Sequence, residues 1–152
     1  MNTLPSTSLL PLAVSQYWTQ AQVLFDLGAR NFLFMTVPPI QRTPKILDSN
    51  ATVQGQVVGA VGEINCLLEK GYGQFLRVNR GGLNGTGSEL RTWLFNTTTV
   101  FDEVLNNPTA YGAPDATCYD GNGVSCLWWN DFHPGQAIHK VLAGAVANLT
   151  GF

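Results

Sequence analysis

The chain has 152 residues, of which 45% are hydrophobic and only 12% charged, and its formal net charge is −2. This composition is that of a globular domain with about half the usual share of charge. It has no cluster of Lys and Arg, which excludes the electrostatic footprint of nucleic-acid binding. No apolar run approaches the roughly 18 residues of a membrane span. Neither nucleic acid nor a membrane is therefore expected as a partner.

The N-terminal segment does not have the pattern of a signal peptide. It has no Lys or Arg before its first apolar stretch, residues 9–14, and that stretch is too short for a signal sequence. A secreted protein with this sequence would need a further segment upstream.

The first half of the chain predicts a helix, a strand and a second helix. Apolar residues at helical spacing predict a helix over residues 14–25, with Gly28 just past its end. The short apolar run 31–37, ended by two prolines, predicts a strand buried on both faces. A second helix is predicted over residues 57–68 and should stop at Gly71. The six glycines between residues 71 and 87 predict a loop.

The second half predicts one more strand and two more helices. Residues 90–95 form the strand, and Asn96 caps a short helix that Pro108 ends. Residues 109–127 are rich in turn formers. Pro134 is expected near the first turn of a final helix, whose apolar face comprises Ile138, Val141, Leu142, Ala145 and Leu149. Alternating helices and strands predict an α/β fold with a parallel sheet. Two strands are too few for a complete doubly wound domain, so the order of the predicted helices and strands is that of the second half of such a domain.

The three cysteines suggest one disulfide. Cys118 and Cys126 flank a turn at residues 120–123, and a bridge between them would stabilise the fold by roughly 2–3 kcal/mol. Cys66 lies in a helical pattern and is predicted to be a buried free thiol. A zinc site made by Cys118, Cys126 and His133 fits no standard spacing, so no metal is predicted. The chain also lacks a P-loop and a dinucleotide fingerprint, and no cofactor is predicted.

Four Asn-x-Ser/Thr sequons occur in this short and weakly charged chain. They begin at Asn50, Asn84, Asn96 and Asn148. Carried glycans would supply the solubility that charges do not, which favours a secreted glycoprotein. The alternative is that Asn and Thr are simply abundant.

The stretch LWWNDFHPG, residues 127–135, holds the candidate functional residues. His133 is either a general base presented on a loop or a structural histidine before a helix, and chemistry alone leaves these two readings even. Asn130 and Asp131 are close enough in sequence to orient it. Trp128 and Trp129 are either core residues or a platform for sugar stacking, and at least one should be core. His139 is expected to be a surface or packing residue.

Three blocks of the sequence resemble GDSL-type (SGNH) esterases. They are LGARNFLFMTVPPIQRTP, FDEVLNNPTAYGAPDATCYD and WWNDFHPGQAIHKVLA, in that order, and the resemblance covers about residues 14–149. The nearest variety is the fungal secreted type, such as the acetylesterases of carbohydrate esterase family sixteen. The resemblance implies a flavodoxin-like three-layer α/β/α fold and ester hydrolysis by a Ser nucleophile. It also implies that His133 is the catalytic base.

Two departures from the family pattern matter. The blocks that would hold the Ser nucleophile and the Gly and Asn of the oxyanion hole have no counterpart in this chain. Asn130 stands where the family has an acidic residue, three positions before the His. Asn accepts a hydrogen bond but cannot stabilise imidazolium by charge, and Asp→Asn in the analogous role of serine proteases costs roughly 10⁴ in rate.

Residues 1–152 are therefore predicted to form a single partial SGNH domain, the C-terminal half of an ester hydrolase that acts on acetylated carbohydrate or short acyl esters. The isolated chain is expected to be inactive, and its expected partner is the missing N-terminal half. Two alternatives remain open. The chain is a non-catalytic module that binds carbohydrate through Trp128 or Trp129, or it is a truncated gene product that aggregates through exposed sheet edges.

Overall fold

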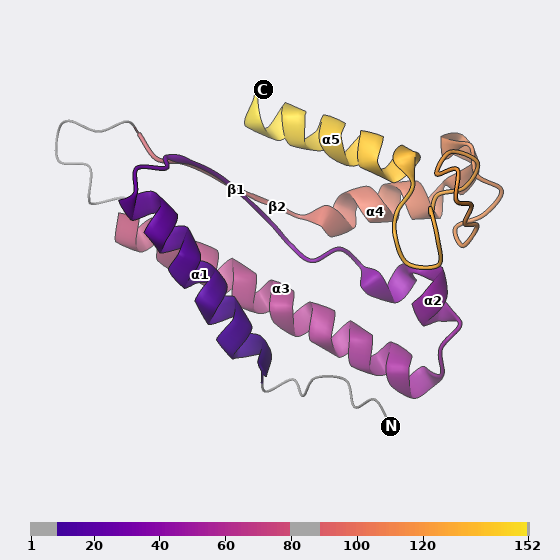
Figure 1. Ribbon diagram of the computed structural model, residues 1–152, viewed down its shortest axis with the longest axis horizontal. Helices are drawn as coiled ribbons and strands as arrows, with labels where there is room; N and C mark the ends of the chain where they lie inside the picture. The colour runs from indigo at the N-terminus through magenta and orange to yellow at the C-terminus, as the bar shows by residue number, and fades with distance from the viewer. Residues whose placement is uncertain (1–8, 80–88, 152) are drawn as a thin grey trace. The chain divides into compact units, whose positions relative to one another are not determined.

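The computed structural model describes residues 9–79 and 89–151, which divide into two compact units. The first unit comprises Met1–Thr36 and Gly62–Phe95, and the second comprises Val37–Val61 and Asn96–Phe152. The elements in chain order are α1 (Leu10–Asp26), β1 (Asn31–Met35), η2 (Ile40–Arg42), α2 (Pro44–Leu47), α3 (Ala51–Asn79), β2 (Arg91–Phe95), α4 (Thr97–Asn106), η3 (Pro108–Tyr111) and α5 (Gln136–Thr150), and Figure 1 labels the α-helices and the two strands.

The first unit is built on a parallel two-stranded sheet. Phe34 of β1 pairs with Leu94 of β2, and the two strands run side by side in Figure 1. Successive strand residues point to opposite faces. Phe32 and Phe34 therefore share one face, where they pack with Ala21 of α1 and Phe75 of α3. Leu33, on the opposite face, keeps 37% of its surface exposed, so the prediction that this strand is buried on both faces is wrong for the described residues. The sequence prediction of two parallel strands is confirmed.

The predicted helix over residues 14–25 is confirmed as part of α1. The helix begins earlier than predicted, at Leu10, and its last carbonyl groups accept backbone bonds from Leu27 and Gly28. Gly28 has a φ of 107°, a conformation that costs glycine little and other residues much. The turn at Gly28 leads directly into β1.

The predicted end of the second helix at Gly71 is wrong. α3 continues through Gly71 and Gly73 to Asn79. A helix-interior glycine costs about 1 kcal/mol relative to alanine. Packing outweighs this cost because Tyr72 and Phe75 join the core of the first unit. The remainder of the predicted loop, residues 80–87, lies outside the described residues.

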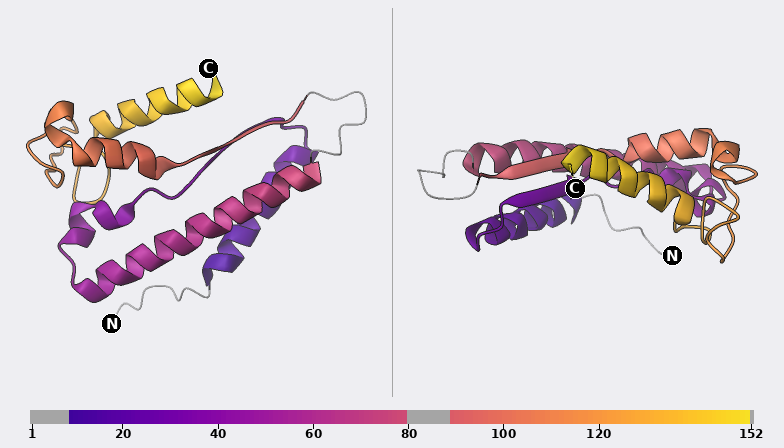
Figure 2. Two further views of the ribbon diagram at one scale, coloured as in Figure 1. Left: turned by 180° about the vertical axis from the view of Figure 1, so that it is seen from behind. Right: turned by 90° about the horizontal axis from the view of Figure 1, so that it is seen from above.

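The second unit has its core between α4, α5 and the turn-rich segment that joins them. α4 and α5 lie side by side in Figures 1 and 2. The core residues are Phe101, Val104, Leu105, Ala113, Leu127, Trp128 and Ile138. As predicted, Asn96 caps α4, with its side chain accepting from the backbone N–H of Thr98.

Of two local predictions for the remaining residues, one is confirmed and one needs correction. Pro134 lies near the first turn of α5, as predicted, directly before the N-cap Gly135 of a helix that begins at Gln136. The backbone of Pro134 also forms an antiparallel bridge with Trp128. Cys66 is free, as predicted, but it is exposed rather than buried.

The described elements therefore form a mixed α/β fold with two parallel strands and mostly helices, in agreement with a partial three-layer α/β/α architecture. No helix among the described residues is both long enough and apolar enough to cross a membrane. The assignment of residues 1–152 to one partial domain stays a prediction.

Candidate active-site loop

The candidate site is a closed loop, residues 127–135, on the second unit. The backbone N–H of Trp129 donates to the carbonyl of His133 at 2.8 Å, and that of Gly135 donates to the carbonyl of Leu127 at 2.7 Å. Trp128 is 1% exposed, and its indole N–H donates to the carbonyl of Ala116 at 2.8 Å. The base of the loop is thus fixed in the core, whereas its tip faces solvent.

Asn130 organises the tip of this loop. Its Oδ1 accepts the backbone N–H of Phe132 at 2.9 Å and that of His133 at 2.7 Å, which forms an Asx turn. The same oxygen lies 3.2 Å from Nδ1 of the His133 ring. Because two backbone donors face this atom, it must be the amide oxygen rather than the nitrogen.

The orientation of Asn130 determines the tautomer of His133. An amide oxygen only accepts hydrogen bonds, so the neutral imidazole must carry its proton on Nδ1 to make this contact. Nε2 is then left with its lone pair, which is the arrangement that a general base requires. The His133 side chain is exposed, so this lone pair is accessible.

Asp131 is directed away from this pair. Its backbone carbonyl accepts the N–H of Lys45 at 2.8 Å, and its carboxylate lies 3.9 Å from Nζ of Lys45. The structure therefore brings together two of the three residues predicted to be catalytic, Asn130 and His133, and uses Asp131 to attach the loop to α2.

The two tryptophans of the loop have different environments. Trp128 is in the core and offers no exposed ring face to a sugar. Trp129 is 51% exposed, and its indole N–H donates to the carbonyl of Gly121 at 2.7 Å, which fixes its ring. The centre of this ring lies 6.4 Å from that of His133. Only Trp129 of this pair is placed to stack on a ligand beside His133.

Sequence reasoning missed a second segment of the site, the chain that follows β1. This segment, residues 38–43, lines an apolar pocket of about 200 Å³ together with Phe101, Trp128 and His133. The position of this segment directly after a predicted parallel strand could have indicated it, since ligands of parallel sheets bind beyond the carboxyl ends of the strands. Arg42 holds it in place, donating from Nη1 to Asp102 at 2.6 Å and from Nη2 to Asn106 at 2.9 Å.

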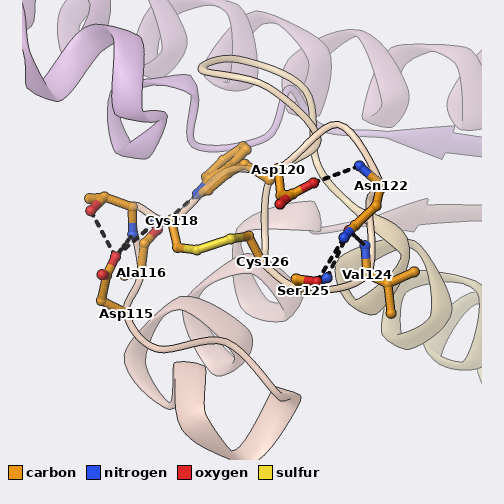
Figure 3. Close-up of a disulfide and its surroundings, with 10 residues drawn as sticks. Asp115, Ala116, Cys118, Asp120, Asn122, Val124, Ser125 and Cys126 are labelled. Atoms are coloured by element: carbon orange, nitrogen blue, oxygen red, sulfur yellow. Dashed lines mark hydrogen bonds between the residues drawn. A yellow bond between two sulfur atoms is a disulfide. The ribbon is translucent and has the colours of Figure 1, made fainter.

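The structure joins Cys118 and Cys126 by a disulfide within the segment shown in Figure 3. Both sulfurs are in this bond, so they are not available as ligands for the zinc site considered above. No group of three or more His, Cys, Asp or Glu side chains within residues 9–79 and 89–151 is placed to hold a metal ion.

Asp115 shapes the chain just before the first of these cysteines. Its carboxylate accepts the hydroxyl and the backbone N–H of Thr117 and the backbone N–H of Cys118 (Figure 3). These hydrogen bonds lower the pKa of Asp115 below its ordinary value, and the bond from the Thr117 hydroxyl has the largest effect on that pKa.

Those of the remaining candidates that the structure describes lie on the surface. Asn50, Asn96 and Asn148 are exposed, whereas Asn84 lies outside the described residues. His139 is exposed on α5, as expected for a surface residue.

Comparison with known proteins relates the chain to GDSL-type esterases. It is 40% identical to an acetylesterase from Thermothelomyces thermophilus over 141 residues, which cover 93% of this chain and 44% of the acetylesterase. Two GDSL esterase/lipases from Arabidopsis thaliana are 28% and 26% identical over 90% and 87% of this chain and 40% and 39% of their own lengths. No protein-family profile matches the chain. The resemblance to part of a GDSL-type esterase is confirmed, and the chain spans under half the length of these curated relatives.

Proposed function

We propose that this chain, a partial GDSL-type esterase, is the part of an ester hydrolase that carries the catalytic base. His133 is the base and Asn130 is the residue that positions it. The observation that supports this most strongly is the 3.2 Å contact between Asn130 Oδ1 and His133 Nδ1, with the amide oriented by two backbone N–H groups.

The chemistry follows from the position of the protons. Nε2 of His133 accepts the proton of a serine hydroxyl as the serine oxygen attacks the ester carbonyl, and later donates that proton to the leaving alkoxide. The imidazolium that forms in between keeps its Nδ1–H bond to Asn130. In this proposal the serine and the donors of the oxyanion hole come from the part of the esterase that this chain does not contain.

A chimera tests the proposal. The 44% of the Thermothelomyces acetylesterase that matches this chain is replaced by the chain itself, and hydrolysis of p-nitrophenyl acetate is measured. We expect the chimera to be active and His133→Ala to reduce kcat by at least about 10³-fold. The matched control is His139→Ala, which removes an exposed histidine of α5 and should leave the rate unchanged. The 152-residue chain alone should be inactive.

A chimera that folds, hydrolyses the ester and keeps its rate in His133→Ala would overturn this assignment. Folding is checked by circular dichroism, so that an unfolded chimera is replaced by one with a shifted junction before the rates are compared.

The class of ester substrate and the location of the protein are part of the same proposal. The name of the fungal relative favours acetyl esters, and we propose acetylated carbohydrate or another short acyl ester as the substrate of the complete enzyme. We also propose that the protein is secreted with glycans at the exposed Asn50, Asn96 and Asn148. Asn50 and Asn96 cap helices through Oδ1, so glycans on their Nδ2 atoms would leave both caps in place. A mass decrease on treatment with peptide N-glycosidase would support these sites.

Trp129 supports a second candidate function, carbohydrate binding without catalysis. Trp129 is 51% exposed and its indole N–H is fixed by the carbonyl of Gly121, which suits a flat stacking surface. Titration of xylan or cello-oligosaccharides into the chain, followed by Trp fluorescence, tests this alternative. A saturable change that Trp129→Ala abolishes would favour it, and no change at millimolar ligand would exclude it.

A further inference from the structure

A polar pocket of the second unit has one residue of the candidate loop, Asp131, in its wall. The pocket measures about 580 Å³, which is within the usual range for pockets that bind small molecules. Its other walls come from α2 and from the segment that holds Thr117 and Tyr119. Its lining shares no residue with the lining of the apolar pocket beside His133.

Backbone contacts hold the walls of this polar pocket together. The N–H of Lys45 donates to the carbonyl of Asp131 at 2.8 Å, which joins α2 to the loop. The backbone of Tyr119 forms a parallel bridge with Trp128, the buried residue at the base of the loop. The walls are therefore in place before a ligand arrives, and such preorganisation lowers the cost of binding.

The polar groups of the lining are available to a ligand. No other described residue forms a hydrogen bond with the carboxylate of Asp48 or with the hydroxyl of Tyr119. The carboxylate of Asp131 lies 3.9 Å from Nζ of Lys45, which is too far for a hydrogen bond, and these two side chains are 49% and 60% exposed. Tyr119 itself is 58% exposed, so its ring is open to a ligand as well.

The chemistry of the lining favours a neutral ligand with many hydroxyls. The carboxylates of Asp48 and Asp131 accept hydrogen bonds, the ammonium of Lys45 donates them, and the hydroxyl of Tyr119 does both. An apolar ligand would displace water from these groups without replacing its hydrogen bonds. An anion would meet two carboxylates, and a cation would meet Lys45.

A sugar ring satisfies each part of this lining. Its hydroxyls can donate to the carboxylates and accept from the ammonium, and hydrogen bonds to charged groups are stronger than those between neutral groups. Its C–H face can pack on the ring of Tyr119, which is apolar on its face and polar at its hydroxyl.

From these observations we infer that the polar pocket binds a neutral sugar ring that belongs to the alcohol side of the ester substrate. This inference rests on the proposed function, since it is the base that makes the bound sugar part of an ester. Asp131 lies two residues before His133, and two residues of chain span at most about 7 Å. A sugar held against Asp131 therefore lies close enough to His133 to present an acetylated hydroxyl to it.

Titration of the 152-residue chain with cellobiose tests binding without catalysis, because cellobiose has no ester bond. We expect saturable shifts of the NMR signals of the Tyr119 ring at millimolar concentration. We also expect nuclear Overhauser contacts from the sugar C–H groups to this ring. Cyclohexanol, a ring of the same size with a single hydroxyl, should bind at least about tenfold more weakly because it forms fewer hydrogen bonds to charged groups.

Substitutions in the lining separate the contribution of the ring from that of the carboxylate. Tyr119→Ala should weaken cellobiose binding about fivefold, whereas Tyr119→Phe keeps the stacking surface and should bind more tightly than Tyr119→Ala. Asp48→Asn should weaken binding about fivefold, because its hydrogen bond loses the assistance of the charge. The matched control is Asp26→Asn, an exposed carboxylate at the end of α1 in the first unit, which should not change binding.

The chimera connects the pocket to the ester. The quantity measured is the ratio of kcat/KM for acetylated cellobiose to kcat/KM for p-nitrophenyl acetate. Tyr119→Ala should lower this ratio about fivefold, because only the first substrate has a sugar ring to stack on Tyr119.

Four results would overturn the inference. The first, which needs no variant to fold, is the absence of contacts between cellobiose and the ring of Tyr119. The second is equal affinity for cyclohexanol and cellobiose. The third is binding that Trp129→Ala abolishes and Tyr119→Ala leaves unchanged. The fourth is an unchanged ratio of kcat/KM in the Tyr119→Ala chimera.

The failure of this inference and the failure of the proposed function are distinguishable. Any of the four results together with a chimera that depends on His133 rejects the sugar pocket and leaves the proposed function standing. Binding of cellobiose at Tyr119 together with a chimera indifferent to His133→Ala rejects the proposed function instead.

Discussion

Asn130 Oδ1 contacts Nδ1 of His133 at 3.2 Å and accepts the backbone N–H of the same residue at 2.7 Å. One atom therefore sets both the backbone and the ring of the histidine. In serine proteases, replacing the acid by Asn costs roughly 10⁴ in rate through the wrong tautomer, since an amide can also turn its NH₂ toward the ring. Here the backbone donors hold the oxygen toward His133. Asn130 can thus select the tautomer but lacks the charge that stabilises imidazolium.

The missing charge gives a prediction for Asn130→Asp in the chimera. A carboxylate would keep all three contacts, and charge-assisted hydrogen bonds are about twice as strong as neutral ones, so we expect kcat to rise about tenfold. Asn130→Ala should instead lower kcat by about 10²-fold, because the ring loses its orientation. Steady-state hydrolysis of p-nitrophenyl acetate measures both. An Asp variant with a lower kcat than the parent would contradict this account of the pair.

Gly135→Ala should destabilise the second unit. A Cβ at this position would lie 3.0 Å from the carbonyl oxygens of Gly123, Cys126 and Leu127. The backbone must shift to relieve these contacts, at a cost of about 1–3 kcal/mol. The matched control is Gly144→Ala on α5, where a Cβ meets nothing within 4 Å and helix propensity improves. Urea unfolding compares the two. Equal unfolding midpoints would show that the loop does not need a glycine at position 135.

Gly71→Ala should destabilise the first unit for a different reason. The indole ring of Trp18 on α1 packs directly over Gly71, and an added Cβ would overlap it. We expect a loss of about 1–3 kcal/mol in unfolding free energy, with a change in Trp fluorescence as the ring is displaced. Gly73→Ala, two residues further along α3, meets nothing within 4 Å and should be neutral or stabilising. A stabilised Gly71→Ala protein would mean that α1 does not pack on α3 in this way.

The turn at Asp115 predicts a dependence of stability on pH. Hydrogen bonds from Thr117 and Cys118 lower the pKa of Asp115 in the folded state. A lowered folded pKa contributes stability that is fully present above the unfolded value of about 3.9 and is lost as pH falls through the folded pKa. The difference in melting temperature between the parent and Asp115→Ala should therefore be constant from pH 7 to pH 5 and shrink below pH 4. A difference that is the same at pH 7 and pH 2.5 would refute this role.

Much of the fold could be predicted from local signals in the sequence. The apolar runs before Pro38 and before Asn96 marked the two strands, and the cap at Asn96 marked the start of α4. The end of α3 could not be predicted. Gly71 stays helical because it contacts Trp18, a residue 53 positions earlier in the chain. Local helix propensity does not depend on such distant contacts, so it could not predict this packing.

The candidate site was predictable in its residues but not in its geometry. The spacing of Asn130 and His133 indicated that they could interact, yet only the loop shows that the amide oxygen takes three donors. The direction of Asp131 toward Lys45 depends on α2, which lies more than 80 residues away in sequence. The apolar pocket could not be predicted either, because its lining residues come from segments far apart in the chain.

The tautomer of His133 tests the central claim most directly, and it can be measured on the 152-residue chain itself. Long-range ¹H–¹⁵N correlation spectra distinguish a protonated ring nitrogen from one with a free lone pair, and the spectrum of His139→Ala assigns the signals to His133. At a pH at which the His133 ring is neutral, we predict a protonated Nδ1 and an unprotonated Nε2. Asn130→Ala should lose this preference. A His133 ring protonated on Nε2 in the parent chain would contradict the assignment of this histidine as a positioned base.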